Sequence, residues 1–346
     1  MRRVLLAIAF VPVVGLALLP FDSVDTTPRV RADNHLSSIH ADGQDRALEP
    51  RASVGLKPLT EMTADDRYKG EDGGLYGGGK NQPPVTHFRI ARAETAKIEP
   101  LDAGGKSSPA GTIGLISISM SNATLEFSLF KQLADQDAKK SPQVTIVDCA
   151  QGGQAMAQWV DPQGPAWIEA DRRLKSANVS PTQVQVVWVK LANVRPTGDL
   201  AEHGKKLQKD TLAVLHDAKA RFTNLRIAYL SSRIYGGWTA MPLNPEPYAY
   251  EGAFAVRWLI HDQIKGDPNL NPDPARGSVR SPVLLWGPYL WADGTTPRKS
   301  DGLVYERKDL ATDGTHPSDS GRQKVADMLL RFFQTDSLAS TWYLKK

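Results

Sequence analysis

Asp313 and His316 are the residues of this chain whose types and spacing most clearly suggest catalysis. A carboxylate three residues before a histidine can fold back and hold one imidazole nitrogen, which leaves the other nitrogen free to act as a base. The same stretch is also typical of a loop in which Ser318 or Asp319 caps the following helix. The histidine therefore predicts chemistry only if a nucleophile is found elsewhere in the chain.

Three further candidates each follow a short apolar run. The runs cover residues 113–118, 144–147 and 184–189. Ser121 comes after the first run and is either a nucleophile or, together with Asn122, a cap of the next helix. Gly153 belongs to a pair of glycines after the second run, where the backbone can come close to a ligand. Asn193 follows the third run and could stabilise an oxyanion or simply form a turn.

The elements that would position these residues alternate along the chain. Short β-branched and apolar runs predict strands at residues 113–118, 144–147, 184–189, 225–230 and 283–286. Apolar residues at helical spacing predict helices at residues 123–139, 167–174, 199–222, 250–264 and 318–333. This alternation predicts an α/β three-layer sandwich, with a parallel sheet covered by helices on both faces. Ligands bind such sheets at the carboxyl ends of the strands, which is where the candidates fall.

The order of these features resembles the four sequence blocks of the SGNH, or GDSL-type, hydrolases. The matching positions are Ser121, Gly153, Asn193, Asp313 and His316, within residues 112 to 336. The resemblance implies that Ser121 is the nucleophile, His316 the base and Asp313 the residue that orients the base. It also implies an oxyanion hole made of Gly153, Asn193 and the Ser121 amide, and a five-stranded parallel sheet flanked by helices. The implied reaction is hydrolysis of carboxylic esters without a cofactor.

The sequence departs from that family in two blocks. The first block reads Ser119-Met120-Ser121 where the family usually has Gly-Asp-Ser, so Ser119 is a second candidate nucleophile. The third block reads Leu191-Ala192-Asn193-Val194 where the family usually has Gly-x-Asn-Asp. In the second block, Gly152 is an alternative to Gly153. An ester hydrolase is therefore the main prediction, and a catalytically silent module of the same fold that binds glycan or cell-wall material is the alternative.

Aromatic residues and one arginine follow the last two strands and are candidates for substrate binding. They are Arg233, Trp238, Tyr289 and Trp291. Exposed aromatic faces suit sugar rings, which makes acyl groups on carbohydrate a candidate substrate. The alternative is that these side chains simply pack the loops and bind no ligand. Arg233 could pair with a substrate carboxylate or with a structural acid such as Glu251 or Asp293.

Composition argues against several other functions. A hydrophobic content of 41% and a charged content of 23% are typical of a globular protein. The 42 basic and 38 acidic residues are too evenly balanced to predict nucleic-acid binding. Cys149 is the single cysteine, and the seven histidines lack the spacing of zinc motifs, so neither a disulfide nor a metal site is expected.

The N-terminal residues predict export. Arg2 and Arg3 precede an apolar run from Val4 to about Leu19, which is the order of charge and hydrophobicity in a secretory signal or a short anchor. The protein is therefore expected to be secreted, periplasmic or held at a membrane by that segment alone. The predicted parts are a signal or anchor at 1–22, a disordered linker at 23–65, a Gly- and Pro-rich ordered extension at 66–111, and a hydrolase-like domain at 112–346.

Overall fold

A computed structural model describes residues 49–346 of the chain. The predicted signal or anchor at 1–22 lies outside the described residues and stays a prediction. Within the described part, no helix is both long and apolar enough to cross a membrane.

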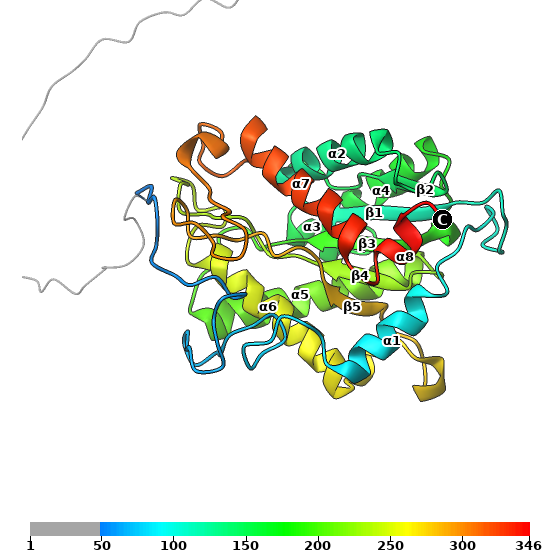
Figure 1. Ribbon diagram of the computed structural model, residues 1–346, viewed down its shortest axis with the longest axis horizontal. Helices are drawn as coiled ribbons and strands as arrows, with labels where there is room; N and C mark the ends of the chain where they lie inside the picture. Colours follow the sequence, from blue (N-terminus) through cyan, green and yellow to red (C-terminus); the bar gives the residue numbers. More distant parts are fainter. Residues whose placement is uncertain (1–48) are drawn as a thin grey trace, which may run out of the picture. The chain divides into compact units, whose positions relative to one another are not determined.

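The core of the domain is a five-stranded parallel sheet, as the sequence predicts (Figure 1). The strands are β1 (Ile113–Ser119), β2 (Val144–Val147), β3 (Val184–Lys190), β4 (Ile227–Leu230) and β5 (Val283–Trp286). They lie in the order β2-β1-β3-β4-β5, which is the flavodoxin-like order of doubly wound folds. The direction of winding reverses between β1 and β3, and ligands of such sheets bind at this switch point. The predicted α/β class is therefore confirmed.

Helices cover both faces of the sheet. They are α1 (Val85–Thr95), α2 (Ser121–Gln136), α3 (Met156–Val160), α4 (Pro165–Ser176), α5 (Leu200–Arg221), α6 (Tyr248–Lys265), α7 (Asp319–Thr335) and α8 (Ser340–Tyr343). Helix α2 packs against α7, and α5 packs against α6. The crossover from β1 to β2 and the crossover from β3 to β4 run in opposite directions across the sheet. Because such crossovers are right-handed, the helix pair α2 and α7 covers one face and the pair α5 and α6 covers the other.

Every residue of β1 and of β3 is buried, which explains why both strands are continuous rather than alternating in hydrophobicity. Aromatic rings pack between the sheet and helices α2 and α7. Phe127 of α2 stacks on Trp188 of β3 at 5.4 Å between ring centroids, and Phe130 stacks on Phe333 of α7 at 5.3 Å. This packing fixes the start of α2 at the end of β1, where Ser121 lies.

The N-terminal boundary differs from the prediction. Residues 49–65 fall in the expected disordered linker, yet Leu59 is fully buried and Met62 is 4% exposed. The backbone N–H of Leu59 donates to the Tyr289 hydroxyl at 3.1 Å. The linker prediction was wrong for these residues, because isolated apolar side chains without any periodicity can still fill grooves on a domain. Its remainder, residues 23–48, lies outside the described residues.

The Gly-rich segment that follows is held by one buried arginine. Arg257 of α6 donates from Nη1 to the carbonyls of Asp72, at 2.7 Å, and Gly74, at 3.2 Å. Gly74 has a φ of +84°, and a Cβ there would lie 2.3 Å from the Lys80 nitrogen, so this tight turn requires glycine. Helix α1 lies in the same extension, which the sequence predicts only as irregular structure.

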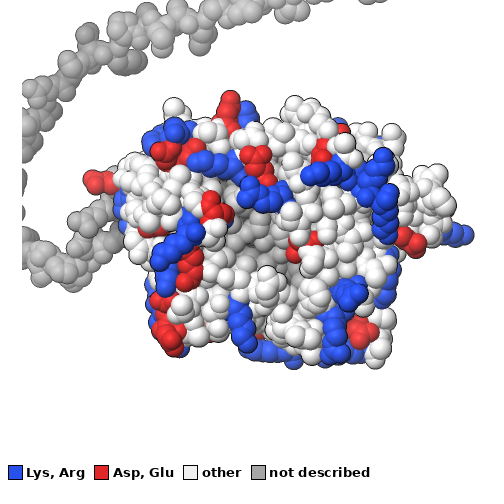
Figure 2. Space-filling model, viewed as in Figure 1, with Lys and Arg blue, Asp and Glu red and all other residues white. Residues whose placement is uncertain are grey.

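The surface carries both signs of charge. On the face shown in Figure 2, Lys and Arg side chains lie interspersed with Asp and Glu around the edge, and the centre is largely uncharged. This distribution agrees with the balanced composition, and this face has no continuous basic patch of the kind that binds nucleic acid.

Candidate active site

Three side chains from the two ends of the domain form one chain of hydrogen bonds. Ser121 is the first residue of α2, and its Oγ lies 2.8 Å from His316 Nε2. On the other side of the ring, His316 Nδ1 lies 2.6 Å from Asp313 Oδ2. Ser121 and His316 are 195 positions apart in the chain. A hydroxyl, an imidazole and a carboxylate in this order are the constellation that activates a serine nucleophile.

The carboxylate of Asp313 is held in its ionised form. Burial alone would raise its pKa, but hydrogen bonds from the His316 side chain and from two backbone amides outweigh burial and lower the pKa. The amides belong to Thr315 and His316, and they donate to Oδ1 at 2.9 and 3.0 Å. An ionised Asp313 accepts the Nδ1 proton of His316, so Nε2 can accept the proton of Ser121.

The loop that carries His316 is braced from several sides. The Ala311 N–H donates to the His316 carbonyl at 2.8 Å. Gly314 has a φ of +65°, and a Cβ there would lie 2.0 Å from the Trp238 carbonyl oxygen, so the loop after β4 packs directly against it. Ser318 also caps α7, with its hydroxyl accepting from the Gly321 N–H at 3.4 Å. The capping role and the positioning of His316 therefore coexist in one loop.

A residue that the sequence suggested only as a helix cap links the two halves of the site. Asn122 is buried, and its Nδ2 donates to the Thr315 carbonyl at 2.8 Å. This bond ties the start of α2, which carries Ser121, to the loop that carries His316. Helix α2 itself is capped by neither Ser121 nor Asn122, because its N-cap is Met120, which makes no side-chain cap.

The second candidate serine does not reach the site. Ser119 is fully buried in β1, and its hydroxyl donates to the carbonyl of Lys190 on the neighbouring strand. Its backbone carbonyl accepts from Trp159 Nε1 at 3.0 Å. Ser119 is therefore a structural residue, and Ser121 is the serine that faces His316.

Three hydrogen-bond donors line a pocket next to Ser121. The pocket has a volume of about 580 Å³, and its lining includes Ser121, Gly153, Asn193 and His316. Within residues 49–346 the backbone N–H groups of Ser121 and Gly153 and the Asn193 amide make no hydrogen bond. Gly153 has a φ of +72°, a conformation that favours glycine, whereas Gly152 does not line the pocket. Donors left free in this way can hold a developing oxyanion.

The predicted aromatic binding residues lie outside this pocket. Trp291 is fully buried and donates from Nε1 to Glu246 Oε1 at 2.8 Å. Tyr289 is 6% exposed, and Trp238 donates from Nε1 to the Tyr305 carbonyl at 2.8 Å. The structure does not support a binding role for these rings, because Tyr289 and Trp291 are buried and none of the three lines the pocket. The expectation of a sugar substrate, which rested on them, has no support from the site.

Arg233 is the predicted binding residue that does line the pocket. Neither proposed structural partner pairs with it. Glu251 forms an ion pair with Lys69 at 2.7 Å, and Asp293 accepts from the backbone N–H of Val54 at 2.7 Å. The side chain of Arg233 is thus left at the pocket wall.

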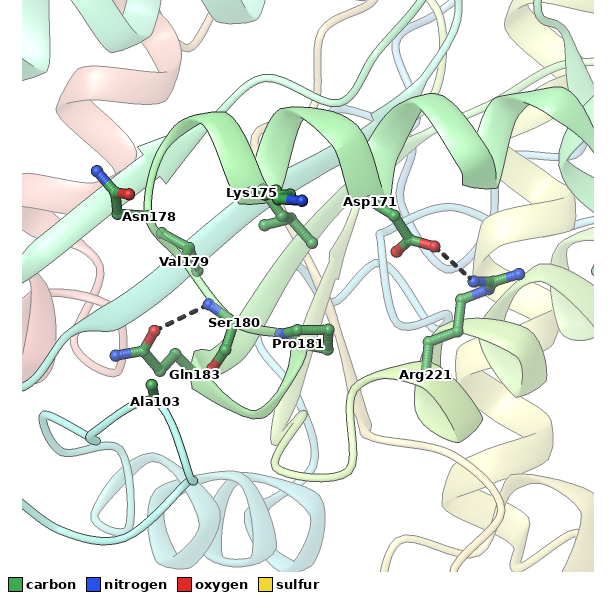
Figure 3. A pocket seen from close by; sticks show the side chains of 10 residues that line it. Ala103, Asp171, Lys175, Asn178, Val179, Ser180, Pro181, Gln183 and Arg221 are labelled. Atoms are coloured by element: carbon green, nitrogen blue, oxygen red, sulfur yellow. Dashed lines mark hydrogen bonds and ion pairs between the residues drawn. The ribbon is translucent and has the colours of Figure 1, made fainter.

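A larger hollow, of about 720 Å³, lies elsewhere on the domain (Figure 3). It is bordered by α4, by the end of α5 and by the segment that enters β3, so it lies toward the amino ends of the strands. Figure 3 shows Asp171 and Arg221 next to each other at one side of it, where they form an ion pair at 3.1 Å. Its lining contains no histidine and no cysteine, and we assign it no chemistry.

Comparison with known proteins gives likenesses of fold at low identity. No protein-family model matches the chain, and no curated protein matches significantly. Among solved structures, a carbohydrate esterase family 3 protein from Talaromyces cellulolyticus has 11% identity and a TM-score of 0.38, over 63% of this chain and 95% of that one.

Two further solved structures are similar to this chain. A protein from Slackia heliotrinireducens assigned as an SGNH hydrolase has 14% identity and a TM-score of 0.35, over 64% of this chain and all of that one. A GDSL-like lipase from Bacteroides thetaiotaomicron has 11% identity and a TM-score of 0.32, over 74% of this chain and 98% of that one. At these values the likenesses carry no argument about chemistry, which rests on the geometry of Ser121, His316 and Asp313.

Proposed function

We propose that this protein is a serine hydrolase that cleaves carboxylic esters, with Ser121 as its nucleophile. The observation that carries the proposal is the hydrogen-bonded chain from Ser121 through His316 to Asp313 at the wall of an open pocket. A purely structural hydrogen bond would not require free oxyanion donors beside it. Here the backbone amides of Ser121 and Gly153 lie in the same pocket, and neither has a hydrogen-bond partner among residues 49–346.

The reaction proceeds in two halves. His316 Nε2 takes the proton of Ser121 as Oγ attacks the ester carbonyl, and Asp313 stabilises the imidazolium that forms. The tetrahedral oxyanion is held by the Ser121 and Gly153 amides and by the Asn193 side chain. The carbon–oxygen bond to the alcohol then breaks, and His316 protonates the leaving alcohol. Water repeats the sequence on the acyl-serine, which releases the acid and restores the serine.

The start of α2 favours this chemistry electrostatically. Ser121 is the N1 residue of a 16-residue helix, so the first N–H groups of the helix point toward the charge that develops on the carbonyl oxygen. Those groups are already oriented before the substrate binds, and such preorganised donors need no rearrangement during the reaction.

Hydrolysis of 4-nitrophenyl acetate by two serine variants tests the proposal. Ser121→Ala removes the nucleophile and should lower kcat by at least about 10³-fold, as expected for loss of a triad member. Ser119→Ala is the matched control from the same sequence block, and it should keep turnover within about twofold because Ser119 does not reach the pocket. Undiminished turnover by a folded Ser121→Ala protein would exclude the proposal and favour a binding module.

A further inference from the structure

The pocket beside Ser121 contains a guanidinium without a carboxylate partner. Arg233 is 4% exposed, and its Nε makes no hydrogen bond in the part of the chain that the structure describes. Its single described contact runs from Nη1 to the sulfur of Met120 at 3.9 Å, and a thioether is a weak acceptor. Within residues 49–346, Nη2 makes no hydrogen bond and keeps some solvent exposure, and Arg233 lines the pocket.

Neither of the nearby acids forms an ion pair with Arg233, although Glu126 Oε1 is left without a hydrogen-bond partner within the described residues. Glu126 of α2 forms a fully buried ion pair with Lys190 of β3, and it acts on Arg233 only through longer-range attraction. The second acid in range, Glu246, accepts from the Gly236 N–H at 2.8 Å and from Trp291 Nε1 at 2.8 Å. Burial lowers the pKa of Arg233 even though the carboxylates of Glu126 and Glu246 attract the guanidinium. The charged form of Arg233 is therefore disfavoured by its surroundings, and a bound anion would stabilise it.

The rest of the pocket also favours an anion. No Asp or Glu side chain belongs to the described lining. Lys206 of α5 also lines the pocket, with its Nζ paired to Asp210 Oδ2 at 2.5 Å. Amide groups from Gln154, Gln158 and Asn244 supply further polar contacts. The lining also includes the aliphatic side chains of Ala192, Val194 and Leu243, against which a short carbon chain can pack.

We propose that the substrate is an ester that carries a second, ionised carboxylate, and that Arg233 binds this carboxylate while Ser121 attacks the ester carbonyl. The proposal rests on the proposed function and adds a substrate class to it. A guanidinium can hold a carboxylate through two parallel hydrogen bonds, a geometry that a single ammonium cannot reproduce. The carboxylate could belong to the acyl part or to the alcohol part of the ester.

Two matched pairs of esters distinguish these sources. For the acyl part, 4-nitrophenyl hemisuccinate is compared with neutral 4-nitrophenyl pentanoate. For the alcohol part, 4-acetoxybenzoate is compared with neutral 4-acetoxybenzamide. In the full-length protein, kcat/KM should favour the charged member of one pair by about 10-fold or more, as expected for a hydrogen-bonded charge pair. Equal values in both pairs would overturn the proposal.

Variants of the arginine test whether it causes that preference. In Arg233→Met the ratio of charged to neutral kcat/KM should fall by about 10- to 100-fold, and Arg233→Lys should restore part of it. Lys209→Met is the control for net charge, because Lys209 is exposed on α5 and does not line the pocket, and its ratio should equal that of the wild type. A preference that survives in Arg233→Met would overturn the proposal.

Binding separates failure of this proposal from failure of the proposed function. Calorimetry with Ser121→Ala should show tighter binding of the hemisuccinate or the acetoxybenzoate than of its neutral partner. The difference should disappear in Ser121→Ala/Arg233→Met. If no ester is hydrolysed but this binding difference is found, the catalytic proposal fails and anion binding stands. Binding that is equal in both proteins, as expected if Arg233 holds only an internal water, would overturn the anion site itself.

Discussion

At the scale of single residues, the proposed catalysis depends on how firmly His316 is held in one tautomer. Asp313 Oδ2 accepts from one ring nitrogen, and Asp313 Oδ1 accepts from two backbone amides, so the carboxylate cannot rotate without losing several bonds. Asn122 adds a tether from the helix that carries the nucleophile. The arrangement resists small displacements, which matter because proton transfer requires hydrogen-bond distance.

Asp313→Asn tests this orientation. An amide in place of the carboxylate can hold the ring in the wrong tautomer and cannot stabilise the imidazolium, so kcat for ester hydrolysis should fall by roughly 10²- to 10⁴-fold with little change in KM. Asp319→Asn, at the exposed start of α7, is the control and should keep normal turnover. Turnover of Asp313→Asn equal to that of the control would show that Asp313 does not orient the base.

At the scale of elements, the strand ends are joined by the side chain of Asp148. This residue follows β2 and accepts from the Ser117 hydroxyl of β1 at 2.6 Å, from the Ala150 N–H at 3.0 Å and from the Thr124 hydroxyl of α2 at 3.1 Å. Burial raises its pKa to about 6, although these hydrogen bonds and Arg173 lower it. Folding therefore favours the protonated form of Asp148, at the edge of the sheet that carries the site, more than the unfolded chain does.

Asp148→Asn should change how stability depends on pH. The pKa of Asp148 in the folded protein, about 6, exceeds the ordinary value of 3.8 for an aspartate side chain. Between these values the folded protein binds a proton that the unfolded chain has lost, so the wild type loses stability as pH rises. The loss is at most about 3 kcal/mol. Asparagine cannot bind this proton. In urea unfolding at pH 4.5, 5.5 and 7, the free energy of unfolding of the wild type should therefore fall with rising pH relative to that of the variant. Parallel curves would contradict the assignment.

At the scale of the whole molecule, a parallel sheet brings distant blocks of sequence to one edge. Much of this follows from the sequence alone, because a buried parallel strand is a continuous apolar run, and residues 144–147 and 283–286 coincide with β2 and β5. The pairing of Ser121 with His316 was implied by the resemblance of four sequence blocks to a known family, and the structure places Ser121 Oγ 2.8 Å from His316 Nε2.

Other features depend on packing that no local pattern encodes. Helix α1 was missed because its buried face consists of His87, Ala91 and Thr95, which gives almost no hydrophobic periodicity. The aromatic residues after β4 and β5 could not be assigned from sequence, because a tryptophan in a loop can face inward or outward, and Trp291 faces inward. The sequence could not show that neither Glu251 nor Asp293 pairs with Arg233. The structure shows it, because Glu251 is bound to Lys69 and Asp293 to the Val54 N–H.

The most direct test of the central claim is covalent labelling of the full-length protein with a fluorophosphonate, followed by mass spectrometry of its peptides. This reagent reacts with a serine that a neighbouring base activates, so its adduct identifies the nucleophile without knowledge of the substrate. We expect one labelled residue, Ser121, with labelling lost in His316→Ala and retained in Ser119→Ala. An adduct on another serine, or no adduct on a folded protein, would contradict the central claim.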